Sequence, residues 1–427
     1  MALTVFSLID FIENIGKKIP FLELITLYLF LSCIAMPVVA YEIFNKHNDL
    51  AKLWVTYMPV PSREYFSYAL PSCLAFLWGT KTSIIKHTPN IQNQIDNIKN
   101  YLKSKSKVGF YLIGIGIVSD IFVSFSPILI KNIVQNFAYL TYIGMFYVIY
   151  SPSKNKILAI VICLALTIGQ SISTGMYGEL VYLSAMSTLI ILGGKKINFY
   201  TKLIIFIFGL SFLFLIQSIK SEYRDKTWSS NFEKKADPVY FINLVYERLQ
   251  NPSTIFEPKR LFNASVRANQ GQIIARVLNY VPKHEPFAYG ETIGVSVLSA
   301  FVPRFLWPDK PKTGGADNVC RFLGDCESFR NGFSYNISPV GEAYVNFGKT
   351  GGVIFMFFYG FFYSFIFNKA HYFSKNNPTI ILWFPLIFFS FFTMENDVLS
   401  FINAFAKSSF FCWLVYKTSK LLFKTNI

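Results

Sequence analysis

Arginine is concentrated in one stretch of this 427-residue chain. Eight of the nine arginines lie between positions 224 and 330, whereas most other cations are lysines. A guanidinium group presents a rigid fork of donors that binds phosphate or carboxylate with two hydrogen bonds, while lysine acts as a hydrated point charge. The concentration predicts an anionic ligand, with structural ion pairs as the alternative for any single arginine. The eight are Arg224, Arg248, Arg260, Arg267, Arg276, Arg304, Arg321 and Arg330.

The segment FVPRFLWPDKPKTGG, residues 301–315, combines three prolines with Trp307, Arg304 and Lys310. Proline fixes the backbone and prevents helix formation, so the two cations are held at set positions. Tryptophan suits a membrane interface or the face of a sugar ring. We expect this segment to form a rigid cationic hook at the membrane surface.

Glu342 and His284 are the candidates for a general base in the same region. A carboxylate or an imidazole can take a proton from a substrate hydroxyl, but such residues also serve as ion-pair or cap partners. No pair of carboxylates at a recognisable spacing supports glycoside hydrolysis by two acids.

Cys320 and Cys326, separated by five residues, lie in the same region, and we expect a local disulfide that pins a loop. No histidine or further cysteine lies near enough for a zinc site, and no metal is expected.

Composition indicates that these residues belong to a membrane protein. Hydrophobic residues make up 53% of the chain and charged residues only 15%, compared with about 25% charged in soluble domains. A spanning helix needs roughly 20 mostly apolar residues, and about ten such runs are present. We predict an all-α polytopic fold with spans near 21–43, 65–80, 108–125, 132–150, 157–170, 178–194, 203–219, 351–367, 378–393 and 400–416.

Lysine placement predicts the orientation of these spans, because cytoplasmic loops are enriched in lysine and arginine. With the N-terminus inside, the cytoplasmic connections hold 18 lysines and the short outer loops four cations. Both termini are then cytoplasmic, and the charge of +16 reflects topology rather than nucleic-acid binding. The chain divides into a first bundle (1–219), a large outer segment (220–349) and a C-terminal bundle (350–427). Helices are expected in the outer segment at 238–250, 260–281 and 291–302.

Polar residues near the span ends predict an outward-facing cavity, because charge inside a membrane is costly and usually functional. Asp120, Lys131, Gln170, Glu179 and Lys220 are candidates for its lining, although Asp120 and Lys131 could instead pair with each other. Lys407 is deeper in its span, where we expect it to pair or to snorkel.

Several motifs carry a resemblance to a known family. Arg276, Pro282, YGET at 289–292, FVPRFLWPDKP and GEAYVNFGKTGG follow one another in the outer segment. Together with IQSIKSEYR at 216–224 and PSREYFSYALP at 61–71, this order resembles Wzy-type O-antigen polymerases and related oligosaccharide repeat-unit polymerases. The resemblance covers most of the chain.

The resemblance implies a glycosyltransferase of the C-type superfamily in the bacterial inner membrane, with its active site facing the periplasm. Such an enzyme transfers a glycan from undecaprenyl pyrophosphate to the non-reducing end of a second lipid-linked repeat unit, without a nucleotide sugar, metal or other cofactor. Its partners would be these lipid-linked oligosaccharides and membrane lipid, with a chain-length regulator as a candidate protein partner and no nucleic acid.

The resemblance and the residue positions together predict the site. Arg276 and Arg304 would bind the pyrophosphate, whose charge grows as the glycosidic bond breaks and is stabilised by fixed positive groups. The other predicted substrate-binding residues are Lys220, Arg224, Arg267, Trp307, Lys310, Tyr344 and Asn346. An O-antigen ligase shares the donor and the architecture, and a repeat-unit flippase is the alternative from another class.

Overall fold

The computed structural model describes residues 1–42, 58–82, 90–123, 125–228, 236–302, 304, 306–330 and 335–423. Within these ranges the regular secondary structure is helical and no β-strand occurs, so the predicted all-α class is confirmed for this part of the chain. The first twelve helical elements are α1 (Ala2–Asn14), α2 (Phe21–Phe30), the π-helical η1 (Leu31–Ala35), α3 (Met36–Glu42), α5 (Ser62–Lys81), α6 (Ile91–Leu102), α7 (Ser106–Val123), α8 (Ile128–Ala138), α9 (Leu140–Tyr150), α10 (Lys156–Thr174), α11 (Gly178–Leu192) and α12 (Phe199–Thr227).

The second half begins with short helices and ends with long ones. The predicted helix at 260–281 is two helices, α14 and α15, while those at 238–250 and 291–302 occur nearly as expected. The elements are α13 (Pro238–Gln250), η3 (Pro252–Phe256), α14 (Pro258–Ala268), α15 (Gly271–Tyr280), α16 (Glu291–Phe301), α17 (Ala316–Leu323), α18 (Cys326–Arg330), α19 (Ser338–Phe373), η4 (Pro378–Trp383), α20 (Phe384–Ile387), α21 (Phe389–Phe392) and α22 (Val398–Phe423).

Six helices in the described part of the chain are long and apolar enough to cross a membrane. A bent pair, Ile91–Leu102 with Lys107–Val123, would make a seventh. The protein is therefore a membrane-embedded helical protein, and the larger number of about ten spans stays a prediction. The six are Phe21–Glu42, Ile133–Tyr150, Lys156–Thr174, Phe199–Thr227, Ser338–Phe373 and Val398–Ser419.

The expected span at 378–393 is not one helix. It is divided into η4, α20 and α21, with Pro378 and Pro385 each in the first turn of a short helix. Proline cannot donate a backbone hydrogen bond and fits best at a helix start, which explains why each segment begins where it does.

Helix α19 begins earlier in the chain than the span predicted at 351–367. It starts at Ser338 and continues through Gly348, where the backbone leaves helical geometry at φ 65° and ψ −164°. This φ favours glycine, because a residue with a Cβ would be strained in that conformation. The segment 338–347, predicted as the end of the outer loop, is therefore the first arm of a kinked helix and is almost entirely buried.

Helices α5 and α19 form the central contact of the bundle. A Cβ on Gly79 would meet the carbonyl oxygen of Phe357, and one on Gly360 would meet that of Phe76. Two glycines therefore let the backbones approach closely, as is common where membrane helices pack through small residues.

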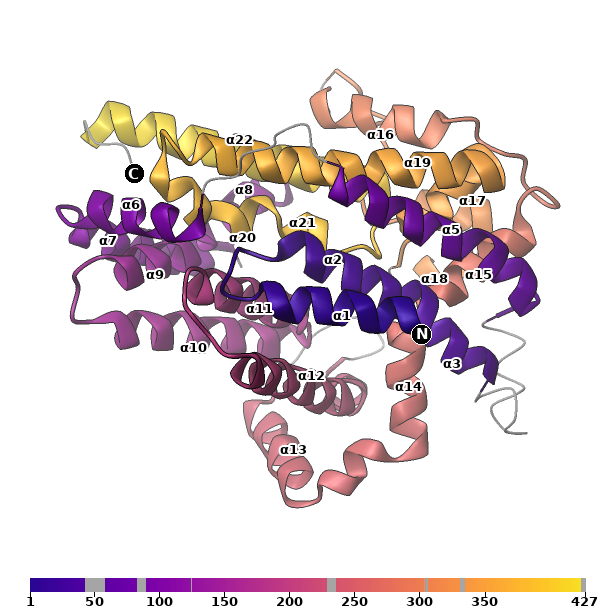
Figure 1. Ribbon diagram of the computed structural model, residues 1–427, viewed down its shortest axis with the longest axis horizontal. Helices are drawn as coiled ribbons and strands as arrows, with labels where there is room; N and C mark the ends of the chain where they lie inside the picture. The colour runs from indigo at the N-terminus through magenta and orange to yellow at the C-terminus, as the bar shows by residue number, and fades with distance from the viewer. Residues whose placement is uncertain are drawn as a thin grey trace.

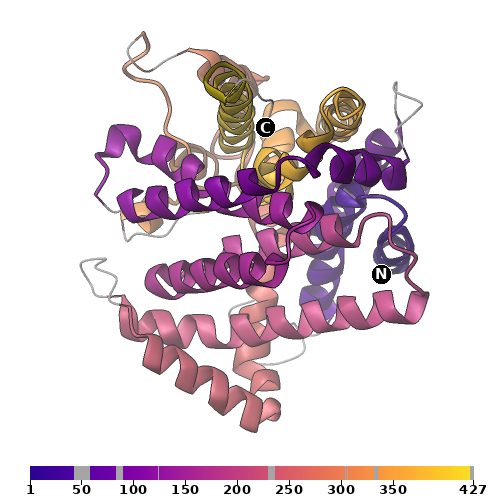
Figure 2. The same cartoon turned by 90° about the vertical axis from the view of Figure 1, so that its left-hand side faces the viewer.

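Most other helices lie to one side of this pair, and α1, α2, α10, α11 and α12 lie below it in the view of Figure 1. Helices α19 and α22 run toward the same end of the molecule, where α6 also lies. Figure 2 shows α19 and α22 nearly end-on, whereas α12 crosses the view. Helix α12 continues to Thr227, beyond its expected end at 219, and packs on α13 through a small separate core that includes Tyr177, Tyr223 and Phe241.

Candidate functional site

The chain turns between α21 and α22 through residues 393–397, TMEND, which we call the acidic loop. Its three consecutive polar side chains, Glu395 to Asp397, point to three different neighbours. Glu395 faces α14, Asn396 faces the segment before α19, and Asp397 faces α17. Because the loop joins two helices of the bundle to three parts of the segment 220–349, it organises the candidate site.

Glu395 faces two cations, Lys220 on α12 and Arg267 on α14. It accepts a hydrogen bond from Arg267 at 3.2 Å and one from Gln270 at 3.1 Å. The charges of Arg224, Arg267 and Glu395 all act on Lys220. The Glu395 carboxylate raises the pKa of Arg267, against the effect of burial. The structure thus brings together Lys220, Arg224 and Arg267, which the sequence predicted separately, and we call these residues with Glu395 the Glu395 cluster.

A cavity of about 450 Å³ lies on the Asn396 side of the acidic loop. This volume is within the range of small-molecule sites, roughly 300–1,000 Å³. Its walls come from α8, α9, α11, α20, α21 and α22, and amides, hydroxyls and one lysine supply the polar groups. These are Gln135, Asn136, Tyr139, Tyr142, Thr313, Asn336, Asn396, Ser400, Asn403, Lys407 and Ser408.

The cavity has the chemistry of a site for a hydroxyl-rich ligand. Amide side chains both donate and accept hydrogen bonds, as sugar hydroxyls do. Gly315, which follows the lining residues Thr313 and Gly314, has φ 83°, and a Cβ there would meet the Asn336 amide oxygen. Only glycine lets this segment pack so closely against the Asn336 side chain.

A second set of cations, the Lys407 cluster, lies beside the cavity. Lys407 lines the cavity directly, and the charges of Lys407 and Arg304 act on Lys310. Burial is the main cause of the lowered pKa of Lys310, and the two neighbouring cations lower it further. Among the residues that the structure describes, none of the three has a carboxylate ion pair. An anion approaching this cluster would therefore meet three cations that have no carboxylate ion pair with any described residue.

The predicted hook holds two of these cations. Arg304 donates to the carbonyl oxygen of Pro308 at 3.4 Å, and Lys310 donates to that of Val302 at 3.2 Å. Trp307, which lies between Arg304 and Lys310 in the sequence, is half-buried. Pro303, which should end α16, lies outside the described residues.

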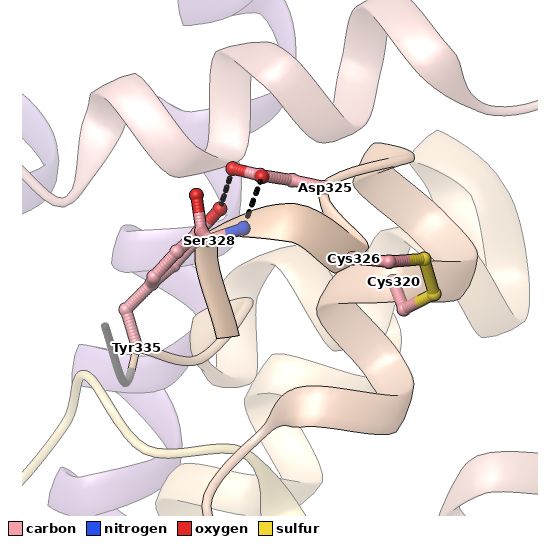
Figure 3. The surroundings of a disulfide bond; sticks show 5 residues. All are labelled: Cys320, Asp325, Cys326, Ser328 and Tyr335. Atoms are coloured by element: carbon pink, nitrogen blue, oxygen red, sulfur yellow. Dashed lines mark hydrogen bonds between the residues drawn. A yellow bond between two sulfur atoms is a disulfide. The ribbon is translucent and has the colours of Figure 1, made fainter. Parts of the chain in front are cut away.

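Arg276 belongs to a different network. Figure 3 shows its partners Asp325 and Tyr335 beside the disulfide. Its guanidinium donates to Asp325 at 3.0 Å and to Tyr335 at 3.4 Å, and the Tyr335 hydroxyl also donates to Asp325. The predicted bond between Cys320 and Cys326 is present and ties α17 to α18 directly beside Asp325. Arg276 and Arg304, expected together on one pyrophosphate, therefore lie in separate networks.

Electrostatic interactions in this network favour the charged forms of Arg276 and Asp325. Burial raises the pKa of Asp325, but hydrogen bonds from Tyr335, Ser328 and Arg276 outweigh it and hold the pKa well below its ordinary value. Burial and the neighbouring carboxylate raise the pKa of Tyr335 to about 12. Asp325 is thus ionised and Tyr335 protonated at neutral pH.

Glu342 and Asn346 are fully buried beneath the acidic loop. Glu342 accepts hydrogen bonds from Thr292 at 2.8 Å and from the backbone N–H of Val398, the first residue of α22, at 2.6 Å. Asn346 donates to Thr292 at 2.7 Å and accepts from the backbone of Gly290 at 3.0 Å. Neither lines the cavity. Both fix α16 against α19, and Glu342 also fixes the start of α22.

The two other predicted residues lie apart from the cavity. Tyr344 is buried, donates to the carbonyl oxygen of Val281 at 3.3 Å and packs against Tyr68. His284 is exposed, with its ring 4.9 Å from that of Tyr280.

Three further arginines of the outer segment have carboxylate partners, as the ion-pair alternative expects. Arg248 pairs with Glu222, Arg260 with Glu257 at 3.3 Å, and Arg321 with Glu285 at 2.6 Å. The side chain of Arg330 lies outside the described residues.

Polar residues of the spans contribute to the cavity indirectly. Tyr139, which lines it, donates to Glu179 at 2.7 Å, and the charge of Asp120 acts on Glu179. No ion pair between Asp120 and Lys131 occurs in the described part of the chain, where Lys131 is exposed.

Sequence reasoning did not select the acidic loop or the amides of the cavity. Three consecutive polar residues, Glu395 to Asp397, interrupt two apolar runs, and this interruption was an available signal. Asn403 and Lys407 are four residues apart and share one face of α22, which was a second signal. The amides of α8 carry no comparable signal.

Together, the fold and site define a helical membrane protein with a polar cavity flanked by two groups of cations. The chain belongs to the family described as "Domain of unknown function (DUF8712)", whose sequence profile matches residues 73–420. That match includes the acidic loop, the cavity and both cation clusters. No curated protein and no solved structure matches the chain.

Proposed function

We propose that this protein is a membrane glycosyltransferase that polymerises lipid-linked oligosaccharide repeat units. The observation that carries the proposal is the juxtaposition of the amide-lined cavity with the Lys407 cluster. One part of the substrate is a sugar chain rich in hydroxyls and the other is an anionic pyrophosphate. The two parts match the two neighbouring surfaces.

The reaction transfers a glycan from undecaprenyl pyrophosphate to a hydroxyl at the non-reducing end of an acceptor repeat unit. The bond from the anomeric carbon to the pyrophosphate oxygen breaks, the acceptor oxygen forms the new bond, and its proton is lost. Undecaprenyl pyrophosphate leaves with the bonding electrons. Fixed cations near the leaving oxygen stabilise the charge that develops there.

Lys407, Arg304 and Lys310 are the residues that we assign to the pyrophosphate. Asn336, Asn396 and Asn403 are assigned to sugar hydroxyls, with the ring faces of the cavity tyrosines as apolar platforms. Arg276 and Glu342 then act as positioning residues, because each is committed to protein partners.

The finer topology is part of this proposal. About ten spans, an inner-membrane location, cytoplasmic termini and a periplasmic site all agree with the lysine distribution. Lipid-linked repeat units would be both donor and acceptor, and a chain-length regulator would be the protein partner. The resemblance of the proline-rich hook and of GEAYVNFG to Wzy-type polymerases supports the same assignment.

Complementation of a deletion strain tests the proposal. The gene is deleted from its host and restored as wild type, Arg304→Ala, Lys407→Ala or the control Arg63→Ala, an exposed cation at the start of α5. The glycan ladder on a gel should collapse to a single repeat on deletion and recover only with wild type and the control. Loss of every repeat would favour a ligase or a flippase, and unchanged surface and capsular glycans would refute the proposal.

A further inference from the structure

A second cavity lies away from the acidic loop, between α19, α22 and the η4–α20 segment. Its volume is about 550 Å³, and its lining residues differ from those of the first cavity. The walls are mostly aliphatic and aromatic, with contributions from Ile366 and Phe373 of α19 and from Phe405 and Trp413 of α22. An apolar groove of this size between two candidate membrane spans suits a hydrocarbon chain.

Two lysines border the same groove. Lys369 of α19 and Lys417 of α22 both line it, and both are exposed. The ammonium group of Lys369 lies 5.4 Å from the ring centroid of Phe373. In the described part of the chain neither lysine has an ion pair with a carboxylate.

The two lysines lie in the later part of the groove. Helices α19 and α22 run in the same direction (Figure 1). Ile366 and Phe405 come before the lysines on their respective helices, and Phe373 follows Lys369. The cations therefore lie toward the end where α6 meets α19 through hydrogen bonds from Gln94. An amphiphile would match this arrangement, with its anionic head at the lysines and its apolar chain along the aliphatic and aromatic residues.

We propose that this groove binds an anionic phospholipid of the surrounding bilayer. Its phosphate lies between Lys369 and Lys417, and one acyl chain runs along the groove past Trp413. Basic pockets between membrane helices bind anionic head groups because each lysine near the membrane surface attracts them. The proposal is independent of the glycosyltransferase assignment, since the two cavities share no lining residue.

Tryptophan fluorescence measures occupancy of the groove. The purified full chain is placed in nanodiscs of phosphatidylcholine containing a small fraction of brominated phosphatidylglycerol, whose bromine atoms quench nearby tryptophans. Trp413 is 54% exposed and borders the groove. We expect stronger quenching by brominated phosphatidylglycerol than by brominated phosphatidylcholine, and we expect Trp413→Phe to remove this difference.

Charge variants test the head-group site. Lys369→Gln with Lys417→Gln should weaken the preference for phosphatidylglycerol roughly tenfold or more. The matched control is Lys103→Gln with Lys154→Gln, two exposed lysines outside the groove. A steric variant, Ala370→Phe, places a ring within the groove and should abolish the quenching without removing charge.

Three results would overturn the proposal. The first is equal quenching by the two lipids, and the second is an unchanged preference in the Lys369 and Lys417 double variant that folds normally. The third is displacement of phosphatidylglycerol by a smaller amount of polyprenyl phosphate, which would assign the groove to a glycan carrier instead.

Discussion

Arg267 Nη2 lies 3.1 Å from Glu395 Oε2, and this ion pair joins α14 to the acidic loop across 128 residues of sequence. The Arg267 side chain is half exposed, so the pair contributes little stability by itself, about 1 kcal/mol or less. Its importance is local, because Glu395 provides the negative charge that faces Lys220 and Arg267.

Removing that charge should strengthen anion binding at the Glu395 cluster. Glu395→Gln leaves Lys220 and Arg267 without the carboxylate that faces them, so we expect inorganic pyrophosphate to bind the purified protein several-fold more tightly, with stronger dependence on salt. Isothermal titration at two salt concentrations measures this. Glu257→Gln, which removes the partner of Arg260 instead, is the control, and equal affinities for the two variants would contradict the expectation.

Lys407 should be required for catalysis rather than for folding. Lys407→Ala removes a cation that lines the cavity, and loss of one such electrostatic group typically costs roughly a hundredfold or more in rate. Lys407→Arg keeps the charge and should retain more activity. Polymerisation of a lipid-linked repeat unit in vesicles gives the rates. A Lys407→Ala protein that is stable and fully active would exclude this role.

The Arg276–Asp325 network should make stability depend on pH. The folded pKa of Asp325 is below its ordinary value of 3.8, so its contribution is present above that pH and is lost as pH falls through the folded pKa. Asp325→Asn should lower the free energy of unfolding by about 1–3 kcal/mol at neutral pH. Thermal unfolding in detergent should show the wild type and the variant converging below about pH 4. A difference that stays constant with pH would argue against an ionised Asp325.

The disulfide should stabilise the same network from the other side. Cys320 and Cys326 close a short loop, for which chain entropy predicts about 2 kcal/mol. Cys320→Ser with Cys326→Ser should therefore lower the melting temperature, and dithiothreitol should lower that of the wild type to the same value. If the reductant acted equally on the double variant, another site would be responsible.

Glu342 should act through folding. Glu342→Gln weakens its hydrogen bonds with Thr292 and Val398, and we expect a loss of about 1–3 kcal/mol of stability with a reduced yield of folded protein. Activity per folded molecule should change little. Size-exclusion chromatography with an assay of the monodisperse fraction separates these effects, and an intact but inactive protein would instead identify Glu342 as catalytic.

Hydrophobic patterning predicted the helical class and most apolar helices, because membrane spans are determined by local composition. Hydrophobic patterning predicted the wrong element where one or two residues start or end a helix. Pro378 and Pro385 divide an expected span, and Ser338 begins a helix within an expected loop. Where such a helix starts depends on the tertiary contacts that bury the segment. The first arm of α19 is helical because it is buried in this way.

The site was predictable only in part. Cys320 and Cys326 are close in sequence, so their bond could be anticipated. Arg276 and Asp325 are 49 residues apart, and nothing local indicates that they meet. Nothing local indicates either that Lys310, in a loop, lies near Lys407, in α22. The concentration of arginine drew attention to the segment 224–330, but it could not distinguish paired cations from those beside the cavity.

The acidic loop imposes a limit on how the chain can vary. Its three consecutive polar residues are bound to three separate parts of the protein, and each contact depends on the direction of a single peptide unit. Inserting or deleting one residue between Thr393 and Asp397 would turn all three side chains away from their partners at once. We therefore expect the number of residues in this turn to be constrained more strictly than the apolar side chains of the helices on either side.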